Sequence, residues 1–352
     1  MNPIHQKILE DFHAMRSRFA VLEKTALVVI NEIIETNGIK VTHVDHRLKT
    51  ETSLAGKLVR KEDRYQTVGD ITDLLGFRVI CWYADGVDSF ASRLEEYFDI
   101  DYDNNVDKRE VIRADAFGYL SLHYICSLPF HSGFPEEICG IKFEIQIRTV
   151  LQHIWAEIEH DLGYKSTFGV PRPIRREFSR VAGLLEIADK EFVEIRDSVG
   201  DYNKEVKRRI FENEAQDIPL DASSLYEYMR VNGPMQNFVR DVAAISHAEI
   251  RIIRPDSYLK QLQWLKKSTL GDVQKMLETH RKTAFELAEQ VLSVSELDLI
   301  TTNTALYFLC RAELKDCHYS REQIIEFLMF TVRDEKRACR QADQLLSRTD
   351  EI

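Results

Sequence analysis

The residues from 141 to 165, IKFEIQIRTVLQHIWAEIEHDLGYK, change their hydrophobic period within one continuous run. The first part alternates strictly, with apolar residues on one face and polar residues on the other, as a half-buried strand does. The polar residues are Lys142, Glu144, Gln146 and Arg148. The second part places apolar residues at helical spacing: Leu151, Ile154, Trp155, Ile158 and Leu162. We therefore expect a strand followed by a helix. A solvent-facing sheet edge would suit any one of the polar residues, but the whole set favours a strand that lines a cleft.

The run resembles the end of the synthetase domain of RelA/SpoT-type alarmone synthetases, through its segments EIQIRT, WAEIEH and YK. The resemblance implies an ATP-dependent pyrophosphokinase that transfers a pyrophosphate group from ATP to the ribose 3′-hydroxyl of GDP or GTP. It also implies a nucleotidyltransferase-like α+β domain. No hydrolase domain is recognised, so the resemblance is to synthetase-only members.

Length and charge narrow the class of protein. The chain has 352 residues, which predicts two domains. Its net charge of −11 argues against broad, nonspecific nucleic-acid binding. There is no apolar run of about 18 residues and no signal-peptide pattern, so we expect no membrane association and a cytoplasmic location. The six cysteines form no CxxC pair, which speaks against a zinc site.

Strand and helix signals are interspersed in the first half of the chain and nearly vanish after Pro171 and Pro173. The first half predicts an α+β domain with a mixed β-sheet flanked by helices. We place this synthetase domain at residues 1–199, with a long N-terminal helix over 3–36 and a trailing helix over 176–199. Residues 200–352 are expected to form an all-helical domain of unknown function, including helices near 295–312 and 320–347.

Two acidic residues are candidates for catalysis and for binding Mg²⁺. Pyrophosphoryl transfer needs carboxylates for magnesium, which takes few protein ligands. The resemblance assigns this role to Asp73, in DLLGFR, and to Glu144, in EIQIRT. Taken alone, Asp73 would more simply be a helix cap or turn residue. Glu144 is also the best candidate for accepting the proton of the 3′-hydroxyl.

The segment HRLKTETSLAGKLVRK, from His46 to Lys61, matches the family's ATP-binding segment. A solvated basic helix face is the alternative interpretation. Thr52 or Ser53 near the helix start would add free backbone donors for phosphate. Arg78 would pair with Arg47 to sandwich the adenine. The ATP-binding residues implied by the resemblance are Arg47, Lys49, Ser53, Lys57, Arg60 and Arg78.

The acceptor nucleotide is assigned to the strand GYLSLHY and to its neighbour. The resemblance implies that Tyr119 stacks on the guanine base and that His123 and Gln146 contact the acceptor nucleotide. Half-buried sheet residues are the alternative for the tyrosine and the histidine. On the following helix, the polar stripe of His153, Glu157 and His160 is expected to be a charged face beside the cleft.

The match departs from the family just before this strand. Ala114, Asp115, Ala116 and Phe117 stand where many members have a lysine, proline and asparagine, and Leu120 replaces an arginine. Lys108, Arg109 or Arg113 could substitute for the missing cations. The acceptor could otherwise be the 3′ end of transfer RNA, as in toxin-type relatives. A non-enzymatic alternative is a nucleotide-sensing scaffold with a decayed site. The helical C-terminal half could bind a regulatory protein or a second copy of the chain.

Overall fold

The computed structural model describes residues 2–61, 64–107, 121–130, 133–164, 172–231, 233–295 and 297–347. The chain divides into two compact units, Met1–Arg196 and Asp197–Ile352. The sequence placed the boundary after residue 199. In the structure the helix α8 (Arg172–Phe211) runs through this position without a break.

The first unit contains a mixed sheet in the order β1-β2-β6-β5-β3, with β4 also paired to β5. The strand β2 pairs with β6 in parallel, whereas the other pairs are antiparallel. The mixed sheet predicted from the sequence is therefore confirmed. The strands are β1 (Val41–Leu48), β2 (Leu75–Cys81), β3 (Asp99–Ile100), β4 (Val106–Asp107), β5 (Leu122–Ser127) and β6 (Phe143–Thr149).

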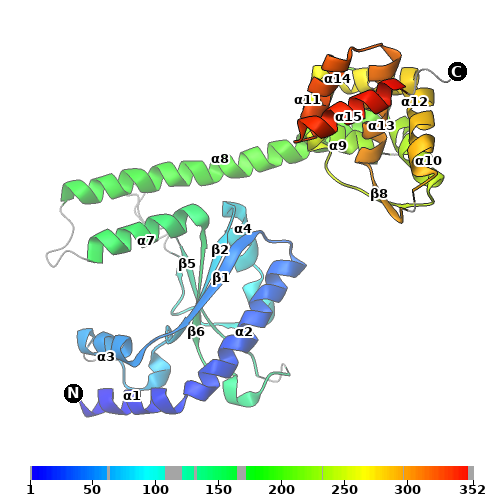
Figure 1. Cartoon of the computed structure of the whole chain (residues 1–352). Helices are drawn as coiled ribbons and strands as arrows, with labels where there is room; N and C mark the ends of the chain where they lie inside the picture. Colours follow the sequence, from blue (N-terminus) through cyan, green and yellow to red (C-terminus); the bar gives the residue numbers. More distant parts are fainter. Residues whose placement is uncertain are drawn as a thin grey trace. The chain divides into compact units, whose positions relative to one another are not determined.

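One face of this sheet is apolar and faces the core. Phe77, Ile145 and Ile147 are fully buried in a cluster shared with the N-terminal helices α1 (Pro3–Ala14) and α2 (Arg16–Thr36). Figure 1 shows α2 running beside the sheet. The sequence predicted one continuous helix over 3–36, and this is wrong, because the chain turns at Met15.

The turn at Met15 has a packing reason. It keeps the rings of Phe12 and Phe19 5.8 Å apart, with both side chains buried. A straight helix would hold these positions about two turns apart. No proline or glycine marks this break in the sequence.

The other helical segments of the first unit are short, apart from α7 and α8. α4 packs on β2 and β6, and α5 packs on β3, whereas α3 and η1 contact α1 and η2 contacts α2. Their bounds are α3 (Glu51–Arg60), η1 (Val68–Asp70), α4 (Ala84–Ala91), α5 (Leu94–Tyr97), η2 (Glu136–Ile138), α7 (Val150–Tyr164) and α8, which belongs to both units.

The second unit is helical, as predicted, and has its own core around buried side chains such as Phe238, Leu306 and Phe327. Its helices after α8 are α9 (Ala222–Arg230), α10 (Pro234–Ile245), α11 (Asp256–Trp264), α12 (Leu270–Leu292), α13 (Asn303–Asp316), α14 (Arg321–Met329) and α15 (Glu335–Ser347).

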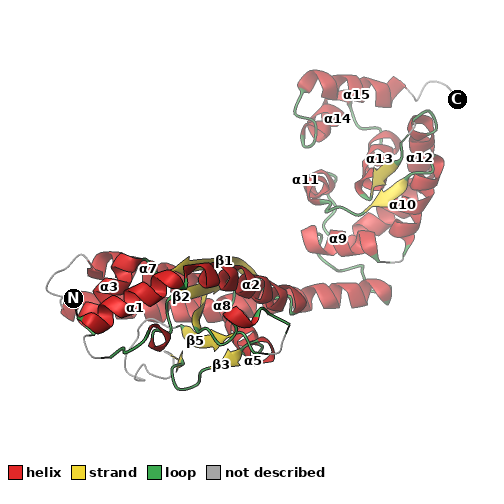
Figure 2. Ribbon diagram, turned by 90° about the horizontal axis from the view of Figure 1, so that it is seen from below, coloured by secondary structure: helices red, strands yellow, loops and turns green. Residues whose placement is uncertain are grey.

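The structure adds a short parallel sheet to this unit, formed by β7 (Glu249–Arg251) and β8 (Leu299–Thr301). Figure 2 shows the two strands in yellow among the helices of this unit. The helix predicted over 295–312 therefore begins only at Asn303. The helix predicted over 320–347 is two helices, because the chain leaves the helical conformation between Met329 and Glu335.

None of the helices in the described ranges combines the length and the hydropathy that a bilayer span requires.

Candidate functional site

The second face of the sheet in the first unit carries polar side chains in two rows across neighbouring strands. Residues that face each other in register point to the same side of a sheet. Arg47 on β1 lies opposite Gly76 on β2, which lies opposite Glu144 on β6. The second row, two residues further along, consists of Asp45, Arg78, Gln146 and His123. The fold thus gathers polar residues from four strands on one face.

A cavity of about 350 Å³ opens over these rows. Gly76 forms part of its lining, and a Cβ atom at this position would meet no heavy atom within 4 Å. The glycine therefore leaves open the space between Arg47 and Glu144. A glycine inside a strand is typical of a site where a ligand comes close to the backbone. The lining residues are Asp45, His46, Arg47, Lys49, Asp73, Gly76, Phe77, Arg78, Glu144 and Gln146.

Asp73 lies at the entry to β2, with an ammonium group on each of its carboxylate oxygens. Lys49 Nζ is 2.8 Å from Oδ2, and Lys57 Nζ, from the helix α3, is 2.7 Å from Oδ1. Burial alone would raise the pKa of Asp73, but the two lysine hydrogen bonds outweigh it and leave that pKa below its usual range. Asp73 is thus a carboxylate in a cationic setting.

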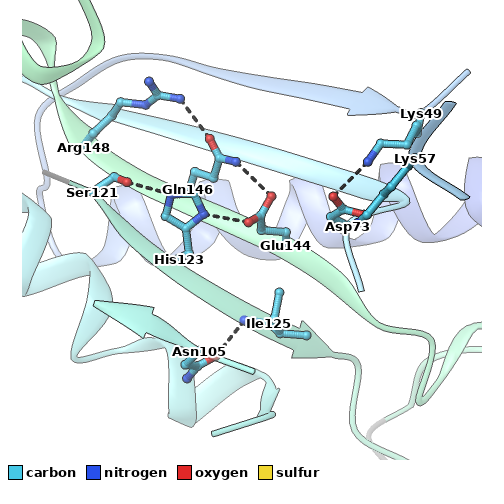
Figure 3. A network of polar contacts seen from close by, with 10 residues as sticks. All are labelled: Lys49, Lys57, Asp73, Asn105, Ser121, His123, Ile125, Glu144, Gln146 and Arg148. Atoms are coloured by element: carbon cyan, nitrogen blue, oxygen red, sulfur yellow. Dashed lines mark hydrogen bonds and ion pairs between the residues drawn. The ribbon is translucent and has the colours of Figure 1, made fainter. Parts of the chain in front are cut away.

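Glu144 sits in a different setting, bonded by a histidine and an amide (Figure 3). His123 Nδ1 donates to Oε1 at 2.7 Å, and Gln146 Nε2 donates to Oε2 at 2.9 Å. The chain of contacts continues at both ends. His123 Nε2 is hydrogen-bonded to the hydroxyl of Ser121 at 2.6 Å, and Arg148 Nη2 donates to Gln146 Oε1 at 2.9 Å. These bonds fix the orientation of the Glu144 carboxylate.

The two carboxylates are close enough to influence each other. Burial would raise the pKa of Glu144, and the charge of Asp73 acts in the same direction. The hydrogen bonds from His123 and Gln146 outweigh both effects, so the pKa of Glu144 is also lowered. Two ionised carboxylates therefore face one cavity, which is an arrangement that attracts a cation.

This donor set fits a divalent cation that is shared with a substrate. Among the residues that the structure describes, no group of three or more His, Cys, Asp or Glu side chains is arranged to hold a metal by itself. Magnesium usually takes only one or two carboxylates and completes its shell with water and phosphate oxygens. The ammonium groups of Lys49 and Lys57 already mark Asp73 as a position that favours positive charge. Asp73 and Glu144 are the residues that could hold the ion.

The two arginines assigned to the adenine both line the cavity but differ in their contacts. Arg78 Nη1 forms an ion pair with Glu157 Oε1 of α7 at 3.1 Å. Arg47 lies on the neighbouring strand and forms no ion pair with a described residue. The face of α7 that carries Glu157 thus borders the site, as expected for the polar stripe of this helix.

Two residues assigned to ATP binding, Ser53 and Arg60, are exposed on α3 and do not line the cavity. The helix begins at Glu51, where the side chain of Thr50 caps it by accepting from the backbone N–H of Ser53 at 3.2 Å. Of the basic residues on α3, Lys57 reaches the site through Asp73.

Part of the predicted acceptor side lies outside the described residues: Tyr119 and the substitute cations Lys108, Arg109 and Arg113. Among the described residues, sequence reasoning assigned no role to Asp45, Ser121 or Arg148. Each of these three lies two positions from an assigned residue, namely Arg47, His123 and Gln146, and therefore on the same face of its strand. This spacing could have identified them from the sequence.

Comparison with known proteins finds matches to the first unit. Residues 46–168 match a family model described as "Region found in RelA / SpoT proteins". The GTP pyrophosphokinase YwaC of Bacillus subtilis (strain 168) is 28% identical over 162 residues, which cover 45% of this chain and 75% of the relative. The GTP pyrophosphokinase YjbM of the same organism is 29% identical over 157 residues, which cover 44% of this chain and 72% of the relative.

Among solved structures, the crystal structure of small alarmone synthetase 2 from Bacillus subtilis aligns with 24% identity and a TM-score of 0.44. The alignment covers 54% of this chain and 97% of that chain. The family match ends at residue 168, before α8 begins.

Proposed function

The chain contains a RelA/SpoT region at residues 46–168, as its motifs predict, and from this premise we propose that it is an ATP-dependent pyrophosphokinase. It transfers the β,γ-pyrophosphate of ATP to the ribose 3′-hydroxyl of GDP or GTP. One observation carries the proposal: Asp73 and Glu144 line the same cavity as the cations Arg47, Lys49 and Arg78. The curated relatives are both GTP pyrophosphokinases.

The donor side of the reaction is assigned to the basic residues around Asp73. Phosphoryl transfer depends mainly on positioning and on stabilising charge. In the structure, Lys49 and Lys57 donate hydrogen bonds to the Asp73 carboxylate. The oxygens of a triphosphate would offer the two lysines alternative acceptors. When the lysines turn to the triphosphate, Asp73 becomes available to a divalent cation such as Mg²⁺. The bound ion would supply charge neutralisation between the phosphates.

The adenine is assigned to Arg47 and Arg78, whose guanidinium planes can stack on a nucleobase. Arg78 can do so only by turning away from Glu157. That ion pair lies near the surface, with Arg78 31% and Glu157 56% exposed, so breaking it costs about 1 kcal/mol at most.

The acceptor side is assigned to Glu144, Gln146 and His123. The 3′-hydroxyl of the acceptor releases its proton to solvent, and its oxygen forms a bond to the β-phosphorus. The bond from that phosphorus to the bridging α,β-oxygen breaks, and AMP leaves with that oxygen. A general base works best when its pKa is near the operating pH. Because the pKa of Glu144 is lowered, we assign it to holding the cation and orienting the acceptor in preference to taking the proton.

A second candidate acceptor is the 3′ end of transfer RNA. The sequence supports it by one observation, the replacement of the family's usual cations by the segment from Ala114 to Phe117 and by Leu120. Those cations would hold the phosphates of GDP or GTP. The donor side has no comparable replacement, so ATP is the donor in both proposals.

A product assay tests the proposal. The purified full-length chain is incubated with Mg²⁺, ATP labelled at the β-position, and GDP, GTP and transfer RNA together. We expect label on the 3′-oxygen of GDP or GTP, release of AMP, and loss of both in Asp73→Ala. Label on transfer RNA selects the second candidate. AMP release with no labelled acceptor, or no reaction at all from folded protein, contradicts the pyrophosphokinase proposal.

We assign the second unit, residues 197–352, to regulation, as a module that binds a protein partner or a second copy of the chain. It lies outside the family match and has a separate core. Because the proposed substrates are cytoplasmic nucleotides, we place the protein in the cytoplasm.

A further inference from the structure

A third carboxylate, Asp45, lines the cavity of the first unit, and the proposed reaction does not use it. The other two carboxylates, Asp73 and Glu144, each receive two hydrogen bonds. In the described part of the chain, the one ion pair of Asp45 is with His43, at 3.4 Å, and both side chains are about half exposed. A pair of this kind contributes little to stability. Asp45 is therefore a carboxylate that is open to a ligand.

Asp45 lies at one end of a polar row that follows β1. Asp45, Arg47 and Lys49 are spaced by two residues, and all three line the cavity. Alternate residues of an extended chain share a face and lie about 6.6 Å apart. Lys49 is the member of this row that contacts Asp73. Asp45 thus lies about 13 Å along the chain from the lysine assigned to the triphosphate, beyond Arg47.

The same carboxylate is the cross-strand neighbour of an arginine assigned to the adenine. Asp45 lies directly opposite Arg78 on β2, and opposed side chains have Cβ atoms about 5 Å apart. The ion pair of Arg78 is nevertheless with Glu157 of α7. The two arginines assigned to the base are therefore neighbours of Asp45, one along its own strand and one across the sheet. A base held between them lies next to this carboxylate.

The position of Asp45 fits the edge of a purine that is farthest from the ribose. A nucleoside triphosphate that lies along β1, with its phosphates at Lys49 and its base at Arg47, directs this edge toward Asp45. In adenine the edge carries the 6-amino group, which donates hydrogen bonds, and a carboxylate accepts them. A carboxylate close to the triphosphate would repel it, and this repulsion is smallest at the far edge of the base.

We propose that Asp45 accepts a hydrogen bond from the 6-amino group of the adenine of ATP and makes the donor site selective for a 6-aminopurine nucleotide. This role rests on the proposed function, because it takes ATP as the donor and Arg47 and Arg78 as the residues that hold the base. It concerns binding of the donor, so it does not depend on the identity of the acceptor or on transfer of the pyrophosphate.

The test compares two ligands that differ only at position 6 of the purine. One is a non-hydrolysable ATP analogue with a methylene group between its α- and β-phosphates, and the other is its 6-desamino counterpart. Isothermal titration calorimetry with Mg²⁺ measures both dissociation constants on the full-length chain. The wild type should bind the amino ligand about 10-fold more tightly, as expected for a hydrogen bond to a charged group that is partly open to water.

In Asp45→Ala this preference should fall from about 10-fold to about one-fold, because the acceptor is gone. The ratio of the two dissociation constants is decisive, since the loss of a negative charge changes the affinity for both anionic ligands equally. Asp45→Asn keeps one acceptor oxygen and should keep about a 3-fold preference. The matched control is Glu157→Ala, which releases Arg78 and should change the affinity for both ligands by the same factor.

The outcomes separate this role from the proposed function. Equal binding of the two ligands by the wild type, or an undiminished preference in Asp45→Ala, overturns the role of Asp45. A chain that shows the preference and transfers no pyrophosphate supports this role and contradicts the pyrophosphokinase proposal. A chain that transfers pyrophosphate without the preference does the reverse. Binding of neither ligand to the folded wild type overturns both.

Discussion

The two units of the chain differ in what surrounds their partly or fully buried charged side chains. In the first unit, Asp73 and Glu144 are 30% and 17% exposed, and both face the cavity. In the second unit, Glu313 is only 6% exposed and is paired with Lys267 at 2.8 Å. Arg311 is likewise buried, with its guanidinium 3.4 Å from the ring centroid of Tyr307.

The difference indicates two roles for charge. Carboxylates that are ionised and open to a cavity can meet a ligand, whereas pairs enclosed by a core can only stabilise or specify the fold. We therefore expect substitutions in the first set to change activity with little effect on stability. Substitutions in the second set should do the reverse.

The largest effect is expected for Glu144→Gln, which keeps the shape of the side chain and removes its charge. We expect pyrophosphate transfer to fall roughly 10³-fold, because the site loses a charge that acts on the reacting groups. The free energy of unfolding should change by less than about 1 kcal/mol. Initial rates and urea unfolding measure the two quantities.

The control is Lys142→Gln, in the same segment but paired with Asp101 away from the cavity. It should keep wild-type activity. Equal losses in both variants would mean that the segment is sensitive to any change in charge.

In the second unit, Glu313→Ala should lower the free energy of unfolding by about 3 kcal/mol, because it leaves the half-buried Lys267 ammonium without its carboxylate. Activity per folded molecule should be unchanged. The matched control is Asp343→Ala, which removes the exposed pair with Arg321 and should cost under about 1 kcal/mol. Similar losses of stability in the two variants would remove the distinction between enclosed and exposed pairs.

Asp189 sharpens the comparison, because it is a buried carboxylate of the first unit that lies outside the cavity lining. Burial raises its pKa to about 6, against a smaller opposing effect of the hydrogen bond from Thr149. A raised carboxyl pKa favours the protonated form in the folded state. Its cost to stability is therefore absent below about pH 4, grows as the pH rises to about 6, and is constant above.

Asp189→Asn should accordingly stabilise the protein by about 3 kcal/mol at pH 8 and have little effect at pH 4. Thermal unfolding at the two pH values measures this. A variant that is less stable than the wild type at pH 8 would show that the carboxylate is held ionised by favourable contacts.

The smallest effect is expected for Arg148→Met. Arg148 is 2% exposed and donates to Gln146, which in turn donates to Glu144, so we treat it as a positioning residue. We expect kcat to fall about 10-fold with an unchanged KM for ATP, by analogy with groups that orient the ligands of a metal. A rise in KM with unchanged kcat would place Arg148 in ATP binding.

The hydrophobic pattern of a short segment predicted the strands and helices that such a segment determines by itself. Alternation in the segment around Glu144 and Gln146 gave a strand with one polar face, and the structure has that strand in β6. The contacts of Asp73 could not be predicted in this way, because Lys49 and Lys57 are 24 and 16 residues away in the chain. Which cations meet a carboxylate is decided by the packing of α3, which contacts α1 and buries Leu54 and Leu58 in the core of the first unit.

Breaks within helices and very short strands could not be predicted from the sequence either. The turn at Met15 has no proline or glycine to mark it, and β7 and β8 have three residues each. Three residues are too few for a period of two to be distinguished from a helical pattern.

The most direct test of the site is the binding of Mn²⁺, as a paramagnetic substitute for Mg²⁺, followed by electron paramagnetic resonance on the full-length chain. The account predicts weak binding of Mn²⁺ alone, since Lys49 and Lys57 occupy Asp73, and binding at least about 10-fold tighter with a non-hydrolysable ATP analogue. Asp73→Asn and Glu144→Gln should each abolish that gain. Equal Mn²⁺ binding in the wild type and in both variants, with the analogue present, would contradict the account.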